Sequence, residues 1–307
     1  KTSIGLPLVN VVWPGEVIFP DFSAEAGVQF WREQVTEFVQ SVNISGLWCD
    51  MNEIAGFVNG SVDASVQQPN SAFDPNNPPY IPGGIPLDVK TVSMDATTQM
   101  GLQYNTHNLY GQLEVKETMK ILEEIHQKRA FILTRSTFVG SGNYSAMWLG
   151  DNESTYYQMK ISMGGIMTMN ILGVQSVGAD ICGFEKNTTQ ELCKRWTSLG
   201  SFYPFARNHN FKDSMDQEPW ALDMVDMTRR HLLNRYSLSP FFYTLFHEAS
   251  RQGGNIWRPL FQLFPSDTIA ADIETQAFVG NAIMLSPVLE EGVTEVITYF
   301  PSGGIFY

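Results

Sequence analysis

The sequence predicts a parallel α/β fold of the barrel type, in which short apolar strands alternate with helices. First, the octapeptide 46–53, Gly-Leu-Trp-Cys-Asp-Met-Asn-Glu, is an apolar run that ends on Asp50 and Glu53. Second, a similar ending occurs about a hundred residues later, at 148–152, where Asp151 follows Trp-Leu-Gly. Third, helical spacing returns between such runs. A parallel barrel presents its catalytic side chains at the carboxyl ends of its strands, so both acids are candidates for one active site.

The first half of the chain follows this alternation. A helix is expected from residue 21, because Val28, Trp31, Val35, Phe38 and Val39 recur at three- and four-residue steps. The strand 46–50 comes next. Residues 56–100 then interrupt the alternation with many Pro, Asn and Gly residues, which predicts a long loop over the mouth of the barrel. Helical spacing returns over 109–128, and the apolar strand 130–134 ends on Arg135.

The second half repeats the cycle and then changes. A short strand enters Asp151, a helix covers 154–172, and the strand 173–178 leads to Asp180. Further helices are expected over about 188–200, 220–236 and 240–251, and the run 202–207 leads to His209. From Trp257 the sequence turns to β-branched and aromatic runs, which indicates the start of a β domain. We therefore expect a partial barrel over 1–255 and the beginning of a C-terminal β domain over 256–307.

Five strand–helix units are too few for a complete eight-stranded barrel, so an open doubly wound sheet is the alternative. No Gly-rich phosphate motif follows any of the strands, which disfavours nucleotide binding. Formal charge is −13, from 32 acidic and 19 basic residues, and this excludes the basic footprint of a nucleic-acid-binding protein. No window of about 18 uncharged apolar residues occurs, so no membrane span is expected in this segment.

Cysteines and glycosylation sequons bear on the compartment. Cys182 and Cys193 are eleven residues apart across a polar loop, so they form either a local disulfide or two free thiols. Cys49 lies inside an apolar strand and is expected to be a buried small hydrophobe. Five sequons with a possible disulfide favour the secretory route, to the lysosomal lumen or the extracellular space. Asn152 adjoins a candidate catalytic acid, so the glycosylation candidates are Asn43, Asn59, Asn143 and Asn187.

The strand-end acids have a structural alternative, which is to cap helices or lie in turns. An acid that ends a buried apolar strand is costly unless it has a role, and this favours function for Asp50. Glu53 is expected to orient its neighbours by hydrogen bonds. Beside Asp151, Trp148 offers an apolar wall that suits sugar stacking and a proton donor. Metal binding by the three acids ranks last, because no matching histidine accompanies them.

The remaining strand ends carry groups that could bind a substrate or stabilise the fold. Arg135 would pair with an internal carboxylate, which in an acidic site also fixes the direction of that carboxylate. Asp180 is either an acceptor for substrate hydroxyls or a helix cap. His209, in Arg-Asn-His-Asn, is either a substrate donor or a satisfied loop histidine.

Many spaced motifs together resemble glycoside hydrolase family 31, in its lysosomal and intestinal α-glucosidase branch. The motifs run through most of the chain and are Val-Trp-Pro-Gly at 12–15, Phe-Pro-Asp-Phe at 19–22, the octapeptide 46–53, His-Asn-Leu-Tyr-Gly at 107–111, Arg-Ser-Thr-Phe at 135–138, Trp-Leu-Gly-Asp at 148–151, Val-Gly-Ala-Asp-Ile-Cys-Gly-Phe at 177–184, Arg-Trp-Thr at 195–197, Phe-Tyr-Pro-Phe at 202–205 and Arg-Asn-His-Asn at 207–210. Cys49 and Ile54-Ala55 depart from the usual family residues.

The resemblance implies a (β/α)8 barrel of which this chain holds strands four to eight. It also implies that Asp50 is the nucleophile, that Asp151 is the acid/base, and that Cys182 and Cys193 form a disulfide. Arg207 would support the sugar pocket from behind. The residues placed around the terminal sugar are Trp48, Met51, Arg135, Trp148, Asp180, Phe184 and His209. An N-terminal part of the same protein, carrying the first three strands, is the implied partner.

We therefore expect a retaining exo-α-glucosidase that removes terminal α-1,4-linked glucose from malto-oligosaccharides or glycogen-like substrates. Retention requires the two carboxyl groups roughly 5–5.5 Å apart, whereas about 6.5–9.5 Å indicates inversion. No metal or organic cofactor is expected. The alternatives are an α-xylosidase or other activity of this family, and a catalytically silent carbohydrate-binding homologue.

Overall fold

The structure is a computed structural model that describes residues 1–2, 5–63 and 73–307. The chain forms two compact units, residues 1–138 and 139–307, and each is described by itself. Part of the expected loop 56–100, including Pro69, falls outside the described residues. Within the described residues, no helix is long and apolar enough to cross a membrane.

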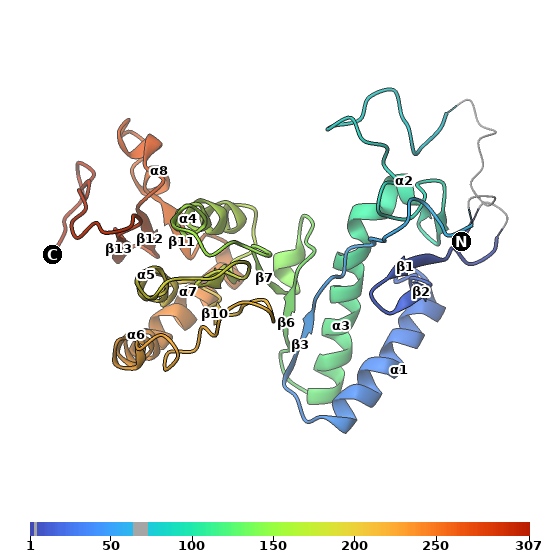
Figure 1. Cartoon of the computed structure of the whole chain (residues 1–307), viewed down its shortest axis with the longest axis horizontal. Helices are drawn as coiled ribbons and strands as arrows, with labels where there is room; N and C mark the ends of the chain where they lie inside the picture. Colours follow the sequence, from blue (N-terminus) through green and yellow to red (C-terminus); the bar gives the residue numbers. More distant parts are fainter. Residues whose placement is uncertain (3–4, 64–72) are drawn as a thin grey trace. The chain divides into compact units, whose positions relative to one another are not determined.

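The first unit contains a parallel strand pair covered by two long helices (Figure 1). Strands β3 and β6 pair in parallel, with Cys49 opposite Thr134 at their carboxyl ends. Helices α1 and α3 lie side by side and α3 packs on β6. The elements are β1 (Asn10–Val12), β2 (Gly15–Val17), α1 (Glu25–Ser41), β3 (Gly46–Cys49), β4 (Thr97–Thr98), β5 (Gly101–Leu102), α2 (Gln103–Thr106), a 3₁₀ turn (His107–Leu109), α3 (Tyr110–His126) and β6 (Phe131–Thr134).

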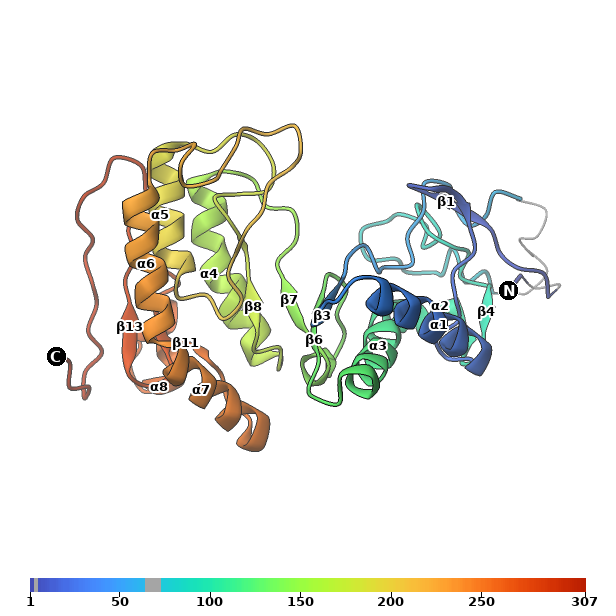
Figure 2. The ribbon, with the colours of Figure 1, turned by 90° about the horizontal axis from the view of Figure 1, so that it is seen from below.

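The second unit continues the alternation of strands and helices and ends in an antiparallel sheet. β7 pairs in parallel with β8, and β9 pairs in parallel with β10. Helix α5 packs on α6, as Figure 2 shows. The elements are a 3₁₀ turn (Ser141–Asn143), β7 (Ala146–Trp148), α4 (Tyr156–Ile171), β8 (Val177–Gly178), β9 (Asp180–Ile181), α5 (Gln190–Gly200), β10 (Arg207–Asn208), α6 (Val225–Ser237), α7 (Ser239–Gln252), β11 (Trp257–Pro259), α8 (Leu260–Leu263), a 3₁₀ turn (Ala270–Asp272), β12 (Ala277–Val279) and β13 (Ile283–Leu285).

Local chemistry sets where two helices of the second unit begin. The Thr155 hydroxyl accepts a hydrogen bond from the Gln158 amide, and the Thr189 hydroxyl accepts one from the Leu192 amide. Each threonine therefore satisfies an amide that the first helical turn would leave without a partner. Helix α4 consequently starts a few residues after Asp151, and α5 starts a few residues after Phe184.

The core of the second unit is large and includes buried polar side chains that pair with one another. Trp196 and Tyr203 are fully buried, and the Trp196 indole donates to the Tyr203 hydroxyl over 3.1 Å. The same hydroxyl lies 2.6 Å from Ser162 Oγ of α4. The Trp257 indole donates to the Phe202 carbonyl over 2.8 Å. These contacts tie β11 to the segment that leads into β10.

Two expectations for local structure are corrected. The strand expected over 173–178 is reduced to Val177–Gly178. The Asn170 amide donates to the carbonyls of Val174 and Gln175, so a turn replaces the start of that strand. Phe38 of the expected apolar stripe is half exposed, and the buried members of that stripe are Val35 and Val39.

Candidate active site

The first site segment is the turn that follows β3. The Asp50 carboxylate is exposed, and its Oδ1 accepts a hydrogen bond from the Met51 amide over 2.9 Å. Met51 has a φ of +53°, a left-handed conformation that residues other than glycine adopt rarely. Such strain persists only where surrounding contacts enforce it. The turn thus presents the Asp50 carboxylate to solvent in a fixed conformation.

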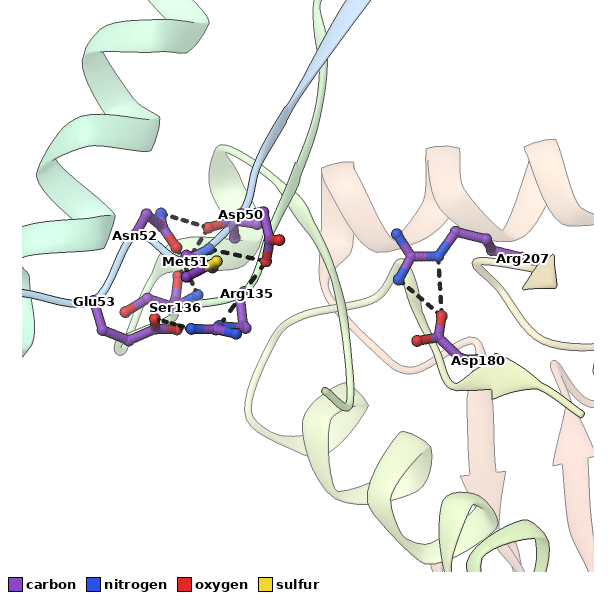
Figure 3. Close-up of polar contacts among 9 residues, drawn as sticks. Asp50, Met51, Asn52, Glu53, Arg135, Ser136, Asp180 and Arg207 are labelled. Atoms are coloured by element: carbon purple, nitrogen blue, oxygen red, sulfur yellow. Dashed lines mark hydrogen bonds and ion pairs between the residues drawn. The ribbon is translucent and has the colours of Figure 1, made fainter. Parts of the chain in front are cut away.

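A charged pair stands beside Asp50 (Figure 3). Arg135, at the end of β6, donates through Nε and one terminal nitrogen to the two oxygens of Glu53, over 2.9 and 2.7 Å. Its Nε lies 4.0 Å from Asp50 Oδ1. The internal carboxylate that Arg135 pairs with is therefore Glu53. The two hydrogen bonds to Glu53 hold the Arg135 guanidinium at ion-pair distance from Asp50.

The buried amide of Asn52, which the sequence analysis did not single out, fastens this turn to the neighbouring strand. Its Nδ2 donates to Thr134 Oγ1 over 2.8 Å, and its Oδ1 accepts from the Ser136 amide over 2.9 Å. Asn52 is 5% exposed, so both contacts are shielded from water. The sequence signal was its position between Asp50 and Glu53, but the partners lie more than 80 residues away.

Aromatic and apolar side chains are exposed on the same unit. Trp48 and Met51, both predicted to line the pocket, are 45% and 44% exposed. Trp13 is 75% exposed and packs edge-to-face against Phe57, with ring centroids 5.1 Å apart. Exposed aromatic faces of this kind suit stacking on sugar rings. Trp13 and Phe57 were not predicted as site residues, although Trp13 belongs to a quoted motif.

The second site segment is built on β7, β9 and β10. Asp180 is fully buried, and Arg207 donates to its Oδ1 through two nitrogens, over 2.9 and 2.8 Å (Figure 3). The Arg207 guanidinium also stacks on Trp148, 4.8 Å from the ring centroid. Phe205 lies on it at 5.7 Å. Arg207, the first residue of β10, therefore connects that strand to the start of β9 and to Trp148 at the end of β7.

The turn after β7 carries an acid, Asp151, and next to it a side-chain amide, Asn152. The Asp151 carboxylate is exposed, whereas Asn152 is 7% exposed. The Asn152 amide donates to the Asp180 carbonyl over 3.0 Å, and its Oδ1 accepts from the Phe184 amide over 3.0 Å. Both polar atoms of the Asn152 side chain are therefore engaged within the protein. Its two hydrogen bonds join the turn that bears Asp151 to Asp180 of β9 and to Phe184 in the loop after β9.

The loop after β9 carries the remaining predicted contacts. The rings of Phe184 and His209 lie 5.1 Å apart at 32° to one another. A disulfide between Cys182 and Cys193 ties this loop to α5, and the predicted bridge is confirmed. Cys49 is free and buried, and burial raises the pKa of its thiol to about 12. The glycosylation candidates Asn43, Asn59, Asn143 and Asn187 are all exposed.

Each unit thus carries an exposed acid after a parallel strand, beside a buried amide and a carboxylate that an arginine holds. A model of the glycosyl hydrolases family 31 TIM-barrel domain matches residues 1–245. A model of the glycosyl hydrolase family 31 C-terminal domain matches residues 253–307. The chain belongs to glycoside hydrolase family 31.

Curated relatives and solved structures agree with this assignment. Lysosomal alpha-glucosidase of Rattus norvegicus is 42% identical over 97% of this chain and 31% of its own length. Alpha-glucosidase of Hordeum vulgare is 41% identical over 97% of this chain and 34% of its own. The glucosidase II alpha subunit with bound Glc1Man2 superposes with a TM-score of 0.83 at 28% identity, over 98% of this chain and 30% of that one. This chain thus spans about a third of the length of these relatives.

Proposed function

We propose that this chain carries the catalytic acids of a retaining exo-α-glucosidase that releases terminal α-1,4-linked glucose from malto-oligosaccharides or glycogen-like substrates. The observation that carries the proposal is the pair of exposed strand-end acids, Asp50 and Asp151, in a chain 42% identical to a lysosomal alpha-glucosidase. The similarity to lysosomal alpha-glucosidases and to an intestinal sucrase-isomaltase supports the substrate class and a secretory or lysosomal location.

The first chemical step assigns one role to each acid. An oxygen of ionised Asp50 attacks the anomeric carbon and forms a glycosyl ester, while the glycosidic carbon–oxygen bond breaks. The proton of Asp151 passes to the departing oxygen, so the leaving sugar departs neutral. Arg135 Nε lies 4.0 Å from Asp50 Oδ1, at the distance of an ion pair.

The second step returns both acids to their starting states. Water gives a proton to the Asp151 carboxylate and attacks the anomeric carbon, which breaks the bond to Asp50. Two inversions at one carbon yield α-glucose. Buried Asp180 and its partner Arg207, with Trp148, would position the terminal sugar, and Phe184 and His209 would line its edge.

The test replaces the nucleophile and follows the anomer of the product. In the full-length enzyme, Asp50→Asn should lower kcat on a chromogenic α-glucoside by roughly 10⁴-fold or more, without loss of thermal stability. Asp226→Asn, an exposed acid on α6, is the matched control and should retain wild-type activity. NMR of the first product of the wild-type enzyme should show α-glucose. Near-normal hydrolysis by Asp50→Asn, or β-glucose as the first product, would contradict the proposal.

A further inference from the structure

A buried carboxyl group of α3 lies against the turn that carries Asp50. A Cβ atom on Gly111 would come within 2.6 Å of Ser136 Cβ and 2.9 Å of the Asn52 carbonyl oxygen, so the α3 backbone rests directly on this turn. Glu114 follows three residues later, on the same face of the helix. Its side chain is buried, at 9% exposure. Glu114 Oε2 has no hydrogen-bond partner among the described residues.

The groups around Glu114 disfavour its charged form. Burial raises the pKa of the Glu114 carboxyl to about 7; hydrogen bonding with the Asn52 side chain opposes the rise, and the nearby charge of Glu53 adds to it. Two further ionisable groups interact with its charge: the Cys49 thiol, which is buried, and the Tyr110 hydroxyl, which is partly buried. Burial raises the pKa of both groups. The Arg135 guanidinium is engaged by Glu53.

We propose that Glu114 is a positioning residue, which acts through Asn52 on the turn that carries Asp50 and keeps that turn competent only while Glu114 is protonated. This inference rests on the proposed function, because it concerns the nucleophile of that reaction. Glu114 touches neither substrate nor the reacting atoms.

The physical reason is competition for the Asn52 amide. With Glu114 neutral, Asn52 holds the turn to β6 through Thr134 and Ser136. An ionised Glu114 would draw Asn52 Nδ2 toward itself and would repel Glu53, the carboxylate that orients Arg135. Both changes loosen the groups around Asp50. Activity should therefore fall as pH rises through neutrality.

The experiment removes the Asp151 carboxyl group and then measures whether kcat/KM still falls at high pH. In full-length enzyme carrying Asp151→Ala, kcat/KM is measured from pH 5 to 8.5 on a 2,4-dinitrophenyl α-glucoside, whose leaving group needs no proton. A single group of pKa about 7 predicts a fall of about tenfold for each pH unit above 7. Adding Glu114→Gln, which is uncharged at every pH, should flatten the profile to within about twofold.

Two variants make the comparison specific. Glu124→Gln, the same change at an exposed position of α3, should keep the parental fall. Asn52→Ala should lower kcat/KM at all pH values, and Glu114→Gln should then have no further effect on the shape of the profile. Thermal melting at pH 5 verifies that each variant is folded. If Glu114→Gln does not fold, Glu114→Leu takes its place in the comparison.

The outcomes separate this inference from the proposed function. A flat parental profile, or an unchanged fall in the Glu114→Gln enzyme, would overturn the role of Glu114 and leave the hydrolase assignment intact. Absence of α-glucoside hydrolysis by the wild-type enzyme would instead defeat the proposed function itself.

Discussion

At the scale of single residues, each segment of the candidate site pairs an exposed acid with a buried amide that fixes its surroundings. Asp50 is exposed beside buried Asn52, and Asp151 is exposed beside buried Asn152. Each amide bridges its own turn to a neighbouring strand end. The exposed acid can therefore meet substrate and water, while its backbone is held by contacts that water does not reach.

Arg135→Lys tests whether the geometry of the cation, in addition to its charge, is needed beside Asp50. Lysine cannot donate the two parallel hydrogen bonds that Arg135 makes to Glu53. Hydrogen bonds to charged groups are worth about 1.5–3 kcal/mol, so kcat/KM should fall roughly tenfold to a hundredfold. Steady-state kinetics at acidic pH measures the loss.

The control for this variant is Arg229→Lys, which alters an exposed pair with Asp226 on α6. Exposed pairs contribute little, and this change should leave kcat/KM within about twofold of wild type. Unchanged kinetics for Arg135→Lys would mean that the two hydrogen bonds from Arg135 to Glu53 have no part in catalysis.

At the scale of elements, the close approach of α3 to the catalytic turn depends on a glycine. Gly111→Ala would place a methyl group 2.6 Å from Ser136 Cβ and 2.9 Å from the Asn52 carbonyl. The helix must then move away from the turn, at a cost of about 1–3 kcal/mol in the free energy of unfolding. Because the displaced atoms belong to the turn that bears Asp50, kcat should fall as well. Denaturant unfolding and steady-state kinetics measure the two effects.

Gly164→Ala in α4 is the matched control, since a Cβ at Gly164 would meet no heavy atom within 4 Å. Alanine favours the helix over glycine by about 1 kcal/mol, so this variant should be slightly more stable and equally active. Wild-type stability and activity of the Gly111→Ala enzyme would show that α3 does not determine the position of the turn.

At the scale of the whole molecule, the sequence predicted what is local. Apolar runs that stop at a polar residue predicted the strand ends before Asp50, Arg135 and Asp151. β3 and β6 end directly before the first two residues, and β7 ends shortly before the third. Asp180 instead begins a strand, β9. Asn52 could not be assigned in this way, because its partners Thr134 and Ser136 are distant in sequence. The pairing of Trp13 with Phe57 and the burial of Glu114 are likewise tertiary properties, which periodicity does not encode. The strand expected over 173–178 was predicted too long, because the Asn170 side chain donates to the Val174 and Gln175 carbonyls and a turn forms there.

The buried Glu114 also gives the stability of the whole molecule a pH dependence. Its native pKa of about 7 exceeds the ordinary value of 4.5, so between these pH values the native state holds a proton that the unfolded state has lost. The stabilisation is fully present below pH 4.5 and is lost as pH rises through 7. At about 1.36 kcal/mol per pKa unit, the loss is at most about 3.5 kcal/mol.

Thermal unfolding of the full-length enzyme at pH 4.5, 6 and 8 should therefore show a decline that Glu114→Gln reduces. His231 contributes in the opposite sense, because burial lowers its pKa and an imidazole held neutral stabilises the native state as pH rises through its ordinary value of 6.5. The difference between wild type and Glu114→Gln removes the His231 contribution, which both proteins share. A difference in Tm that stays constant from pH 4.5 to 8 would mean that Glu114 is ionised in the native state throughout. Such a result would contradict the neutral, buried carboxyl group inferred behind the Asp50 turn.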